Sequence, residues 1–211
     1  MLLSVRNTGG ETLRMQVTAF AWDQRPDGTM QLSPTGEVLF FPKLLSLAAG
    51  EQRRIRVAVT SPPGPMERTY RLFLDELLPP PSQRPAFGGA AARVVTRTAV
   101  PIFLAPTKAV AEGRIEAPRL AGGLLTFDVR NTGRIHLLPR SIRVSGVSSS
   151  GAVVFEREMS GWYILAAGTR RYEVPVPPDA CRGLDRIHIE VRTADAVYAD
   201  RFTGAAASCS G

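Results

Sequence analysis

Hydrophobic and polar positions alternate with a period of two along most of this chain. The runs 13–19, 54–59 and 70–75 show the alternation in the first half, and 186–191 shows it in the second half. Such a run buries one set of side chains and leaves the other in water, as in a strand with one covered face. Turn signals such as Pro26-Asp27-Gly28 separate the runs. Short strands with regular turns predict an all-β chain built from Greek-key sandwiches.

A short repeat divides this pattern into two similar halves. Val-Arg-Asn-Thr-Gly occurs at 5–9 and again at 129–133, each time after a leucine-rich stretch. Each copy has the form of a half-buried strand that ends in an Asn-Thr-Gly turn. The copies begin 124 residues apart, which is too far for a solenoid. The repeat therefore predicts two tandem immunoglobulin-like β-sandwich domains of about 100 residues each.

The domain boundary is predicted from a change in composition after residue 106. Residues 101–106 have the form of a last strand, and an alanine-rich loop leads from there to a new strand. We expect an N-terminal domain at 1–106, a linker at 107–112 and a C-terminal domain at 113–211.

The two copies of the repeat differ in what precedes them. Residues 113–123 come before the second copy, whereas only Met1 to Ser4 come before the first. The second domain therefore has room for an N-terminal strand that the first domain does not have. We expect domain one to lack its N-terminal strand in this chain, together with a signal peptide that would precede that strand.

The chain is basic, and nearly all of its positive charge is arginine. The formal net charge is +7, and lysine occurs only at Lys43 and Lys108. A nucleic-acid or polyanion binder is one interpretation of this balance. The arginines are scattered, with doublets only at 53–54 and 170–171, which favours a solvated basic surface and no nucleic-acid partner. No stretch of about 20 apolar residues occurs, so we expect no membrane insertion.

Residues for catalysis or metal binding are not grouped in the sequence. The two histidines, His136 and His188, stand apart from cysteines and carboxylate clusters. Asp75 and Glu76 are adjacent in a predicted strand and would point to opposite faces. Nucleophile elbows, phosphate loops and dinucleotide motifs are absent from the sequence. We predict no catalytic residue, no metal and no cofactor, and hence a protein that is not an enzyme.

Two cysteines, Cys181 and Cys209, lie in the last third of the chain. They are too few and too far apart for a zinc ribbon. They are candidates for one disulfide that holds the C-terminal tail, and two unpaired thiols are the alternative.

Six segments of the N-terminal half carry a family resemblance when they are taken in order. They are 3–7, 15–22, 39–43, 47–57, 67–76 and 100–106. The run 67–76 has the form E-x-x-Y-R-x-x-x-x-E, and 47–57 is similar to L-x-P-G-x-x-Q-x-V-R-V with Ala49 in place of the proline. Together they resemble the periplasmic pilus or fimbria assembly chaperones of the chaperone–usher pathway, the PapD-like family. The later strands are more similar to its archaic, non-classical or spore-coat-type branch.

The resemblance implies a function called donor-strand complementation. A chaperone of this family lends its last domain-one strand to a pilus subunit that lacks its own final strand, which is β-augmentation. The donor segment here would be 92–103. Alternation leaves open whether Val94 or Val95 faces the subunit. The candidate donor residues are Val94, Val95, Thr96, Thr98, Val100 and Ile102.

The resemblance also implies a site for the carboxylate at the subunit's C-terminus. Family members anchor it with a basic residue on the first strand and a lysine on the last strand, and Pro101 stands at the lysine position here. Arg71 and Arg97 lie on the two strands that would border the cleft, and guanidinium groups bind carboxylates bidentately. They are therefore the candidate anchors.

The functional prediction is a periplasmic chaperone that binds, folds and caps pilus or fibre subunits. It would deliver them to an outer-membrane usher and would be a monomer when it holds a subunit. The alternative is a structural or adhesive two-domain immunoglobulin-like module without chaperone activity.

Overall fold

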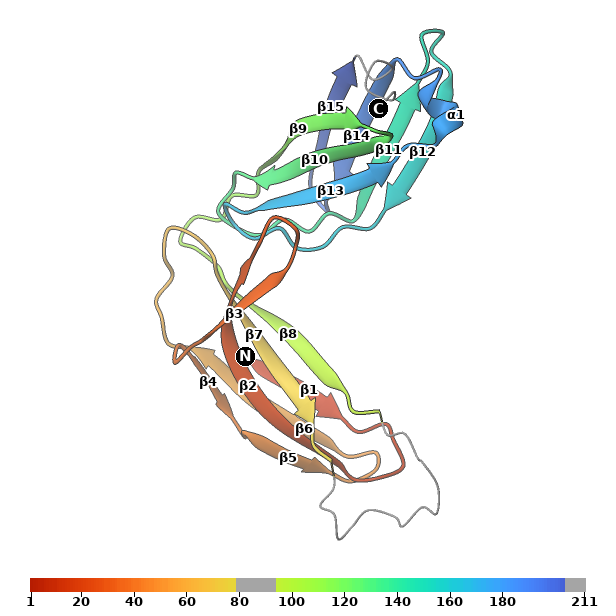
Figure 1. Cartoon of the computed structure of the whole chain (residues 1–211). Coiled ribbons are helices and arrows are strands. Elements are labelled where there is room, and N and C mark those ends of the chain that lie inside the picture. Colours follow the sequence, from red (N-terminus) through yellow and green to blue (C-terminus); the bar gives the residue numbers. More distant parts are fainter. Residues whose placement is uncertain (79–93, 204–211) are drawn as a thin grey trace, which may run out of the picture. The chain divides into compact units, whose positions relative to one another are not determined.

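The computed structural model describes residues 1–78 and 94–203, and nearly all of their regular structure is β-strand (Figure 1). The prediction of an all-β chain is therefore confirmed. One short helix, α1 (Pro178–Cys181), is the exception among the described residues. No helix in these ranges is long and apolar enough to cross a membrane.

The strands follow the alternating runs of the sequence. Those of the N-terminal half are β1 (Leu2–Arg6), β2 (Leu13–Gln24), β3 (Met30–Pro34), β4 (Val38–Phe41), β5 (Leu44–Leu47), β6 (Gln52–Val59), β7 (Arg68–Glu76) and β8 (Arg97–Leu104). Those of the C-terminal half are β9 (Gly113–Ala121), β10 (Leu124–Asn131), β11 (Ser141–Val147), β12 (Val153–Met159), β13 (Thr169–Pro175), β14 (Arg186–Arg192) and β15 (Val197–Thr203).

By its internal contacts the chain forms two compact units. The first consists of Met1–Trp22, Leu32–Pro62 and Arg68–Leu104. The second consists of Asp23–Gln31, Pro63–Glu67 and the chain from Ala105 onward. Residues 107–112, which we predicted as a linker, fall within the second unit.

The first unit is a sandwich of two sheets. One sheet has the strand order β1-β6-β4, and the other has the order β3-β2-β7-β8, with β5 also paired to β2. Its core holds the inward residues that the alternation predicted: Ile55 and Val57 on β6, and Tyr70 and Leu72 on β7, are each at most 3% exposed. These residues meet because every second side chain of a strand faces the partner sheet.

The second unit is a sandwich of the same kind. Its sheets have the strand orders β13-β10-β9 and β12-β11-β14-β15. Phe127 and Val129 on β10 pack against Ile142, Ile187 and Ile189 on the facing sheet, and all five are buried. The alternation predicted at 186–191 is therefore confirmed.

The repeated asparagine holds the same position in both units. The Asn7 side-chain amide donates hydrogen bonds to the carbonyl oxygens of Glu11, Leu47 and Ala48 at 2.7, 3.1 and 3.1 Å. Its Oδ1 accepts a hydrogen bond from the Gly9 amide at 3.0 Å. The asparagine amide suits this turn because its NH2 donates to carbonyls while its oxygen accepts from its own loop.

Asn131 makes the matching set of bonds in the second unit. Its amide donates to the carbonyl oxygens of Ile135, Ile164 and Leu165 at 2.8, 2.9 and 3.0 Å. Its Oδ1 accepts from the Gly133 amide at 2.9 Å. The sequence repeat is thus a structural repeat, and each copy fastens a strand end to a distant loop.

The strands that carry the repeat differ in their neighbours. β10 pairs with β13 on one side and with β9 on the other. Within the described residues β1 pairs with β6 only. The first unit therefore has no counterpart of β9 in these residues, as the flanks of the repeat predicted.

Candidate functional site

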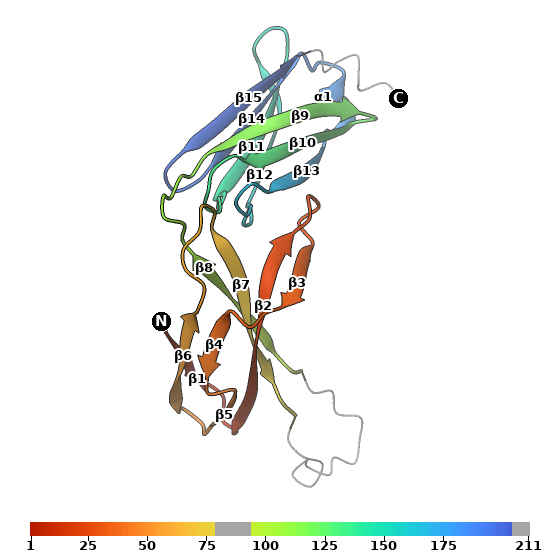
Figure 2. The ribbon, with the colours of Figure 1, turned by 90° about the vertical axis from the view of Figure 1, so that its left-hand side faces the viewer.

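Strand β8 lies at the edge of its sheet, where its outer side is not paired with another strand of the described chain. β7 covers the inner side along its whole length, from the pair Arg68 and Leu104 to the pair Asp75 and Arg97 (Figures 1 and 2). The outer side carries a row of backbone N–H and C=O groups, and such a row is a template on which another chain can pair.

The orientation of this backbone row follows from the bond that precedes β8. The Glu76 amide donates to the Thr96 carbonyl oxygen at 2.9 Å, so the polar backbone groups of Thr96 face β7. In an antiparallel pair this orientation repeats every second residue. Arg97, Ala99, Pro101 and Phe103 therefore direct their backbone groups to the open edge. Proline has no N–H, and here that loss falls on the open edge and leaves the pairing with β7 intact.

The predicted donor residues divide into two groups in this structure. Ile102 is 5% exposed and belongs to the core of the first unit, and Val100 packs against that core. Thr98 has the same parity and is exposed. The side chains of Val100 and Ile102 thus serve the chain's own sandwich.

The residues before β8 form the other group. Val94 is 82% exposed and Val95 is 50% exposed, and neither lies in a strand. Thr96 is held in place because its amide and hydroxyl donate to Glu76 Oε2 at 3.2 and 3.0 Å. The start of the predicted donor segment, 92–93, lies outside the described residues.

Arg71 lies on the face of β7 that points away from the core. Its guanidinium carbon is 3.8 Å from the centre of the Trp22 ring, and the residue is 2% exposed. Trp22 in turn lies against Phe103 of β8, with 6.0 Å between the ring centres. The strand register places Arg71 opposite Pro101. The arginine is therefore a buried part of an aromatic stack, and the sequence did not predict this contact because Trp22 lies far from Arg71 along the chain.

Arg97 is in a different environment on the same face. Its guanidinium binds the Asp75 carboxylate through two nitrogens, one of them at 3.2 Å, and this hydrogen bonding raises the pKa of Arg97. The guanidinium carbon also lies 5.0 Å from the centre of the Phe73 ring. Arg97 is exposed, so its ion pair with Asp75 is open to exchange with another carboxylate.

The structure does not bring the two candidate anchors together. Arg97 lies opposite Asp75, which is four residues from Arg71 on β7. At about 3.3 Å per residue the two backbone positions are about 13 Å apart along the sheet. In this structure the Arg71 guanidinium is buried over Trp22 and the Arg97 guanidinium is paired with Asp75, so each is a separate candidate.

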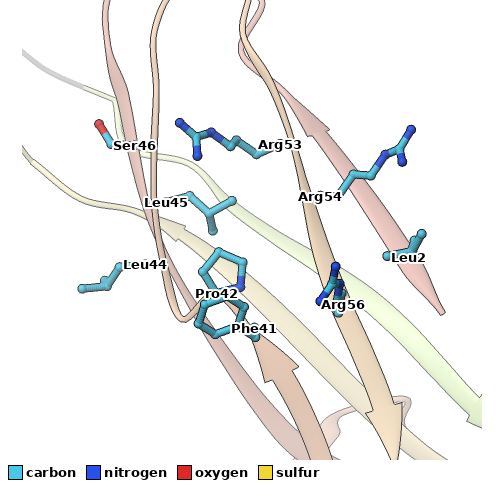
Figure 3. A pocket seen from close by; sticks show the side chains of 9 residues that line it. All are labelled: Leu2, Phe41, Pro42, Leu44, Leu45, Ser46, Arg53, Arg54 and Arg56. Carbon is cyan, nitrogen blue, oxygen red and sulfur yellow. The ribbon is translucent and has the colours of Figure 1, made fainter.

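The structure also has an apolar hollow that the sequence analysis did not predict. It has a volume of about 500 Å³ and is lined by residues of β1, β5 and β6 and by the end of β4 with Pro42 (Figure 3). Leu2, Phe41, Pro42 and Leu44 form the apolar part of its lining, and arginines of β6 form the charged part. The only sequence signal was the pair of phenylalanines before Pro42, which alternation assigns to opposite faces of a strand.

The remaining predicted residues lie apart from β8. His136 Nδ1 lies 2.8 Å from Glu67 Oε2, in a contact within the second unit that the sequence did not predict. In residues 1–78 and 94–203 no group of three or more histidines, cysteines or carboxylates could hold a metal ion. Cys181 is buried on α1, and Cys209 lies outside the described residues, so the disulfide between them stays a prediction.

Comparison with known protein families shows to which family this chain, with its open β8 edge, belongs. The model of the pili and flagellar-assembly chaperones, PapD N-terminal domain, matches residues 1–110. The chain belongs to this family. Its members are pilus assembly chaperones, so the role is not enzymatic, and the family implies a periplasmic location.

Solved structures show the same two-domain fold. The Class 5 fimbriae chaperone CfaA is 13% identical with a TM-score of 0.58, over 95% of this chain and 90% of that one. A chain of the CsuC–CsuE chaperone–tip adhesion subunit complex from Acinetobacter baumannii is 18% identical with a TM-score of 0.57, over 95% and 89%. A chain of the SafA pilin–SafB chaperone complex from Salmonella enterica is 16% identical with a TM-score of 0.56, over 95% and 88%. At these identities the likeness shows the fold alone. No curated protein matches the chain significantly.

Proposed function

We propose that this chaperone binds, folds and caps pilus or fibre subunits in the periplasm by donor-strand complementation, and delivers them to an outer-membrane usher. The observation that carries the proposal is the open edge of β8. A subunit strand that pairs there gains main-chain hydrogen bonds along a strand that β7 already holds in an extended form. Little ordering of β8 is then needed on binding, which favours affinity.

The exposed valines before β8 supply the side-chain part of the interaction. Val94 and Val95 are apolar, lie outside any strand and adjoin the open edge. Extension of β8 by these residues would place one of them in the groove that the missing final strand leaves in the subunit. Burial of its apolar surface there stabilises the complex. Val100 and Ile102 would instead keep the donor strand fixed to its own domain.

Arg97 is the better placed of the two candidate anchors. A subunit carboxylate can replace Asp75 as its partner without uncovering a buried group, whereas Arg71 is 2% exposed. We therefore assign the first contact with a subunit carboxylate to Arg97 and a supporting role to Arg71, which lies opposite Pro101 on the paired strand.

Solved complexes of similar chaperones support pilus subunits as the partners of this chain. Two of the similar structures are described as complexes of a chaperone with a tip adhesion subunit and with a pilin. By analogy we propose that this chaperone holds one subunit at a time as a monomer. The role of the family implies a second partner, the outer-membrane usher. A signal peptide would direct the chain to the periplasm.

The test is co-expression of the full-length gene with the small secreted proteins encoded beside it. We expect a 1:1 complex by size-exclusion chromatography. Ala99→Pro removes one N–H from the open edge and leaves the pairing with β7 in place, so it should weaken the complex by a factor of about three to ten. Ala99→Ser keeps that N–H and is the matched control.

Two outcomes would count against the proposal. Either no secreted partner co-purifies with the parent chain, or Ala99→Pro and Val94→Asp bind the subunit as well as the parent does. The first outcome would favour the alternative of a structural or adhesive module.

A further inference from the structure

Thr96, the residue just before β8, is bound to β7 by the side chain of Glu76. The two residues lie opposite each other, one pair beyond the last register pair of Asp75 and Arg97. The Glu76 amide donates to the Thr96 carbonyl oxygen at 2.9 Å. Thr96 donates from its amide and its hydroxyl to Glu76 Oε2 at 3.2 and 3.0 Å. We call these three hydrogen bonds the Glu76 clamp.

The Glu76 clamp stands where a regular pair of ladder bonds would end. In an antiparallel ladder, the two residues of a hydrogen-bonded pair exchange both of their N–H···O=C bonds. The Thr96 amide donates instead to the carboxylate of Glu76. A carboxylate only accepts, and it has enough lone pairs for both donors of Thr96. Its charge also strengthens each bond, so the clamp holds Thr96 more firmly than one backbone bond would.

Glu76 is itself held in place from the other side of β7. The strand register pairs Glu76 with Met15 of β2, and the next amide, that of Leu77, donates to the Arg14 carbonyl oxygen at 2.8 Å. Glu76 is half-buried, whereas Thr96 is exposed and lies outside any strand. A support built on a paired strand sets the position of the residue that it binds more precisely than a loop would.

A second carboxylate supports the same end of β8 from the opposite face. Neighbouring residues of a strand point to opposite faces, so Asp75 binds the Arg97 guanidinium on one face while Glu76 binds Thr96 on the other. A subunit carboxylate that takes the place of Asp75 at Arg97 removes the first support. The Glu76 clamp remains when that exchange has taken place.

The Glu76 clamp also determines where the open edge begins. The direction of the backbone groups alternates along an extended chain, and those of Thr96 face β7. The N–H and C=O of an extended Val95 are therefore directed to the open edge, in line with those of Arg97. We infer that Glu76 is a positioning residue for subunit binding, whose carboxylate fixes Thr96 so that the edge offered to a subunit begins at Val95. The inference rests on the proposed function and adds to it a residue that acts through Thr96.

The test is a competition between two chaperone chains for one subunit. Parent and variant chains carry different affinity tags and are co-expressed with a limiting amount of the secreted protein that co-purifies with the parent. Without the clamp, Thr96 and Val95 have to be ordered when the subunit binds, and this cost lowers the affinity. We expect Glu76→Ala to capture about tenfold less subunit than the parent. Thr96→Val removes only the hydroxyl donor and should capture about threefold less.

A conservative variant separates positioning from charge. Glu76→Gln keeps a side-chain oxygen that accepts from Thr96 and should stay within about twofold of the parent. Amide hydrogen exchange of the free chains measures the clamp without a subunit. The Thr96 amide should exchange at least about tenfold faster in Glu76→Ala than in the parent. The control is Glu158→Ala, which removes an exposed glutamate at the end of β12 in the second unit and should change neither measurement.

The outcomes distinguish this inference from the proposed function. Equal capture by Glu76→Ala and the parent, while Ala99→Pro still weakens the complex, would overturn the inference and leave the proposed function standing. Equal losses in Glu76→Gln and Glu76→Ala would also overturn it, because charge would then matter and the bonds to Thr96 would not. An unchanged exchange rate of the Thr96 amide in Glu76→Ala would do the same. If no secreted protein binds the parent chain, the proposed function fails and the inference fails with it.

Discussion

Replacement of Asn131 by alanine should destabilise the second unit more than most single changes at a turn. The side chain is 0% exposed and donates to three carbonyl oxygens, so water cannot take over its role. Two of these acceptors keep another partner, because the Ile164 and Leu165 carbonyls also accept from the Leu137 and Gly168 amides. The two N–H groups, shared among these carbonyls, and the Oδ1 that accepts from the Gly133 amide then count as three bonds, each at the low end of the usual cost, about 1 kcal/mol. We expect the free energy of unfolding to fall by about 3 kcal/mol.

The two tryptophans allow this change to be followed in each unit. Trp22 belongs to the first unit and Trp162 to the second. Urea unfolding of Asn131→Ala, followed by fluorescence in Trp22→Phe and Trp162→Phe backgrounds, reports the two units separately. With a urea dependence of about 1.5 kcal/mol per M, a loss of 3 kcal/mol moves the midpoint by about 2 M. The shift should occur in the Trp162 signal.

Asn131→Asp is the matched variant of this experiment. It has nearly the same shape and can still accept from Gly133, but it cannot donate to the carbonyls and would place a charge where there is no water. It should be no more stable than Asn131→Ala. The reasoning fails if Asn131→Asp retains the parent midpoint, or if the Trp22 signal shifts as far as the Trp162 signal.

Three further predictions concern other parts of the two units. Asn7→Ala should lower the stability of the first unit by about 2 kcal/mol in the same urea assay, less than in the second unit because two of its three bonds are only partly buried. Gly146→Val should cost about 1–3 kcal/mol in thermal unfolding, since an added Cβ would come within 2.2 Å of the Phe155 ring; an unchanged midpoint would contradict this. A hydrogen bond from the Tyr70 hydroxyl holds the pKa of Glu37 below its ordinary value of 4.5, so it contributes stability above that pH which is lost as the pH falls through the folded pKa. Tyr70→Phe should therefore make stability less dependent on pH between about 5 and 3, and an unchanged slope would refute the assignment.

The alternation in the sequence was sufficient to predict the strands, because burial of one strand face imposes a period of two. It was also sufficient to predict that Ile55 and Ile189 are buried, and both lie in the cores of their units. It could not assign the faces of β8, because a strand at a sheet edge has an apolar side for its own core whether or not a partner is bound. Val100 and Ile102 therefore entered the prediction as residues that face a subunit, and the structure places them against the first unit's core.

The candidate anchors show a second limit of the sequence. Arg71 and Arg97 were predicted alike as anchors on the strands that border the cleft, yet one is buried against Trp22 and the other is exposed beside Asp75. The difference arises from strand pairing, which brings β2 beside one and leaves the other near the end of β7. The hollow beside Pro42 was missed for the same reason, since Leu2 and Phe41 become neighbours only through β6.

The position of Pro101 has a consequence for where a subunit strand can pair. Its missing N–H lies on the open edge, so an incoming strand finds no donor there. Arg97 and Ala99 each present both a donor and an acceptor on that edge, and Val94 and Val95 are free of any strand next to them. Pairing with a subunit should therefore be strongest at the N-terminal end of β8 and weaken toward Pro101. It follows that Ala99→Pro would interrupt the part of the edge that matters most, whereas Pro101→Ala should restore a donor and strengthen the complex.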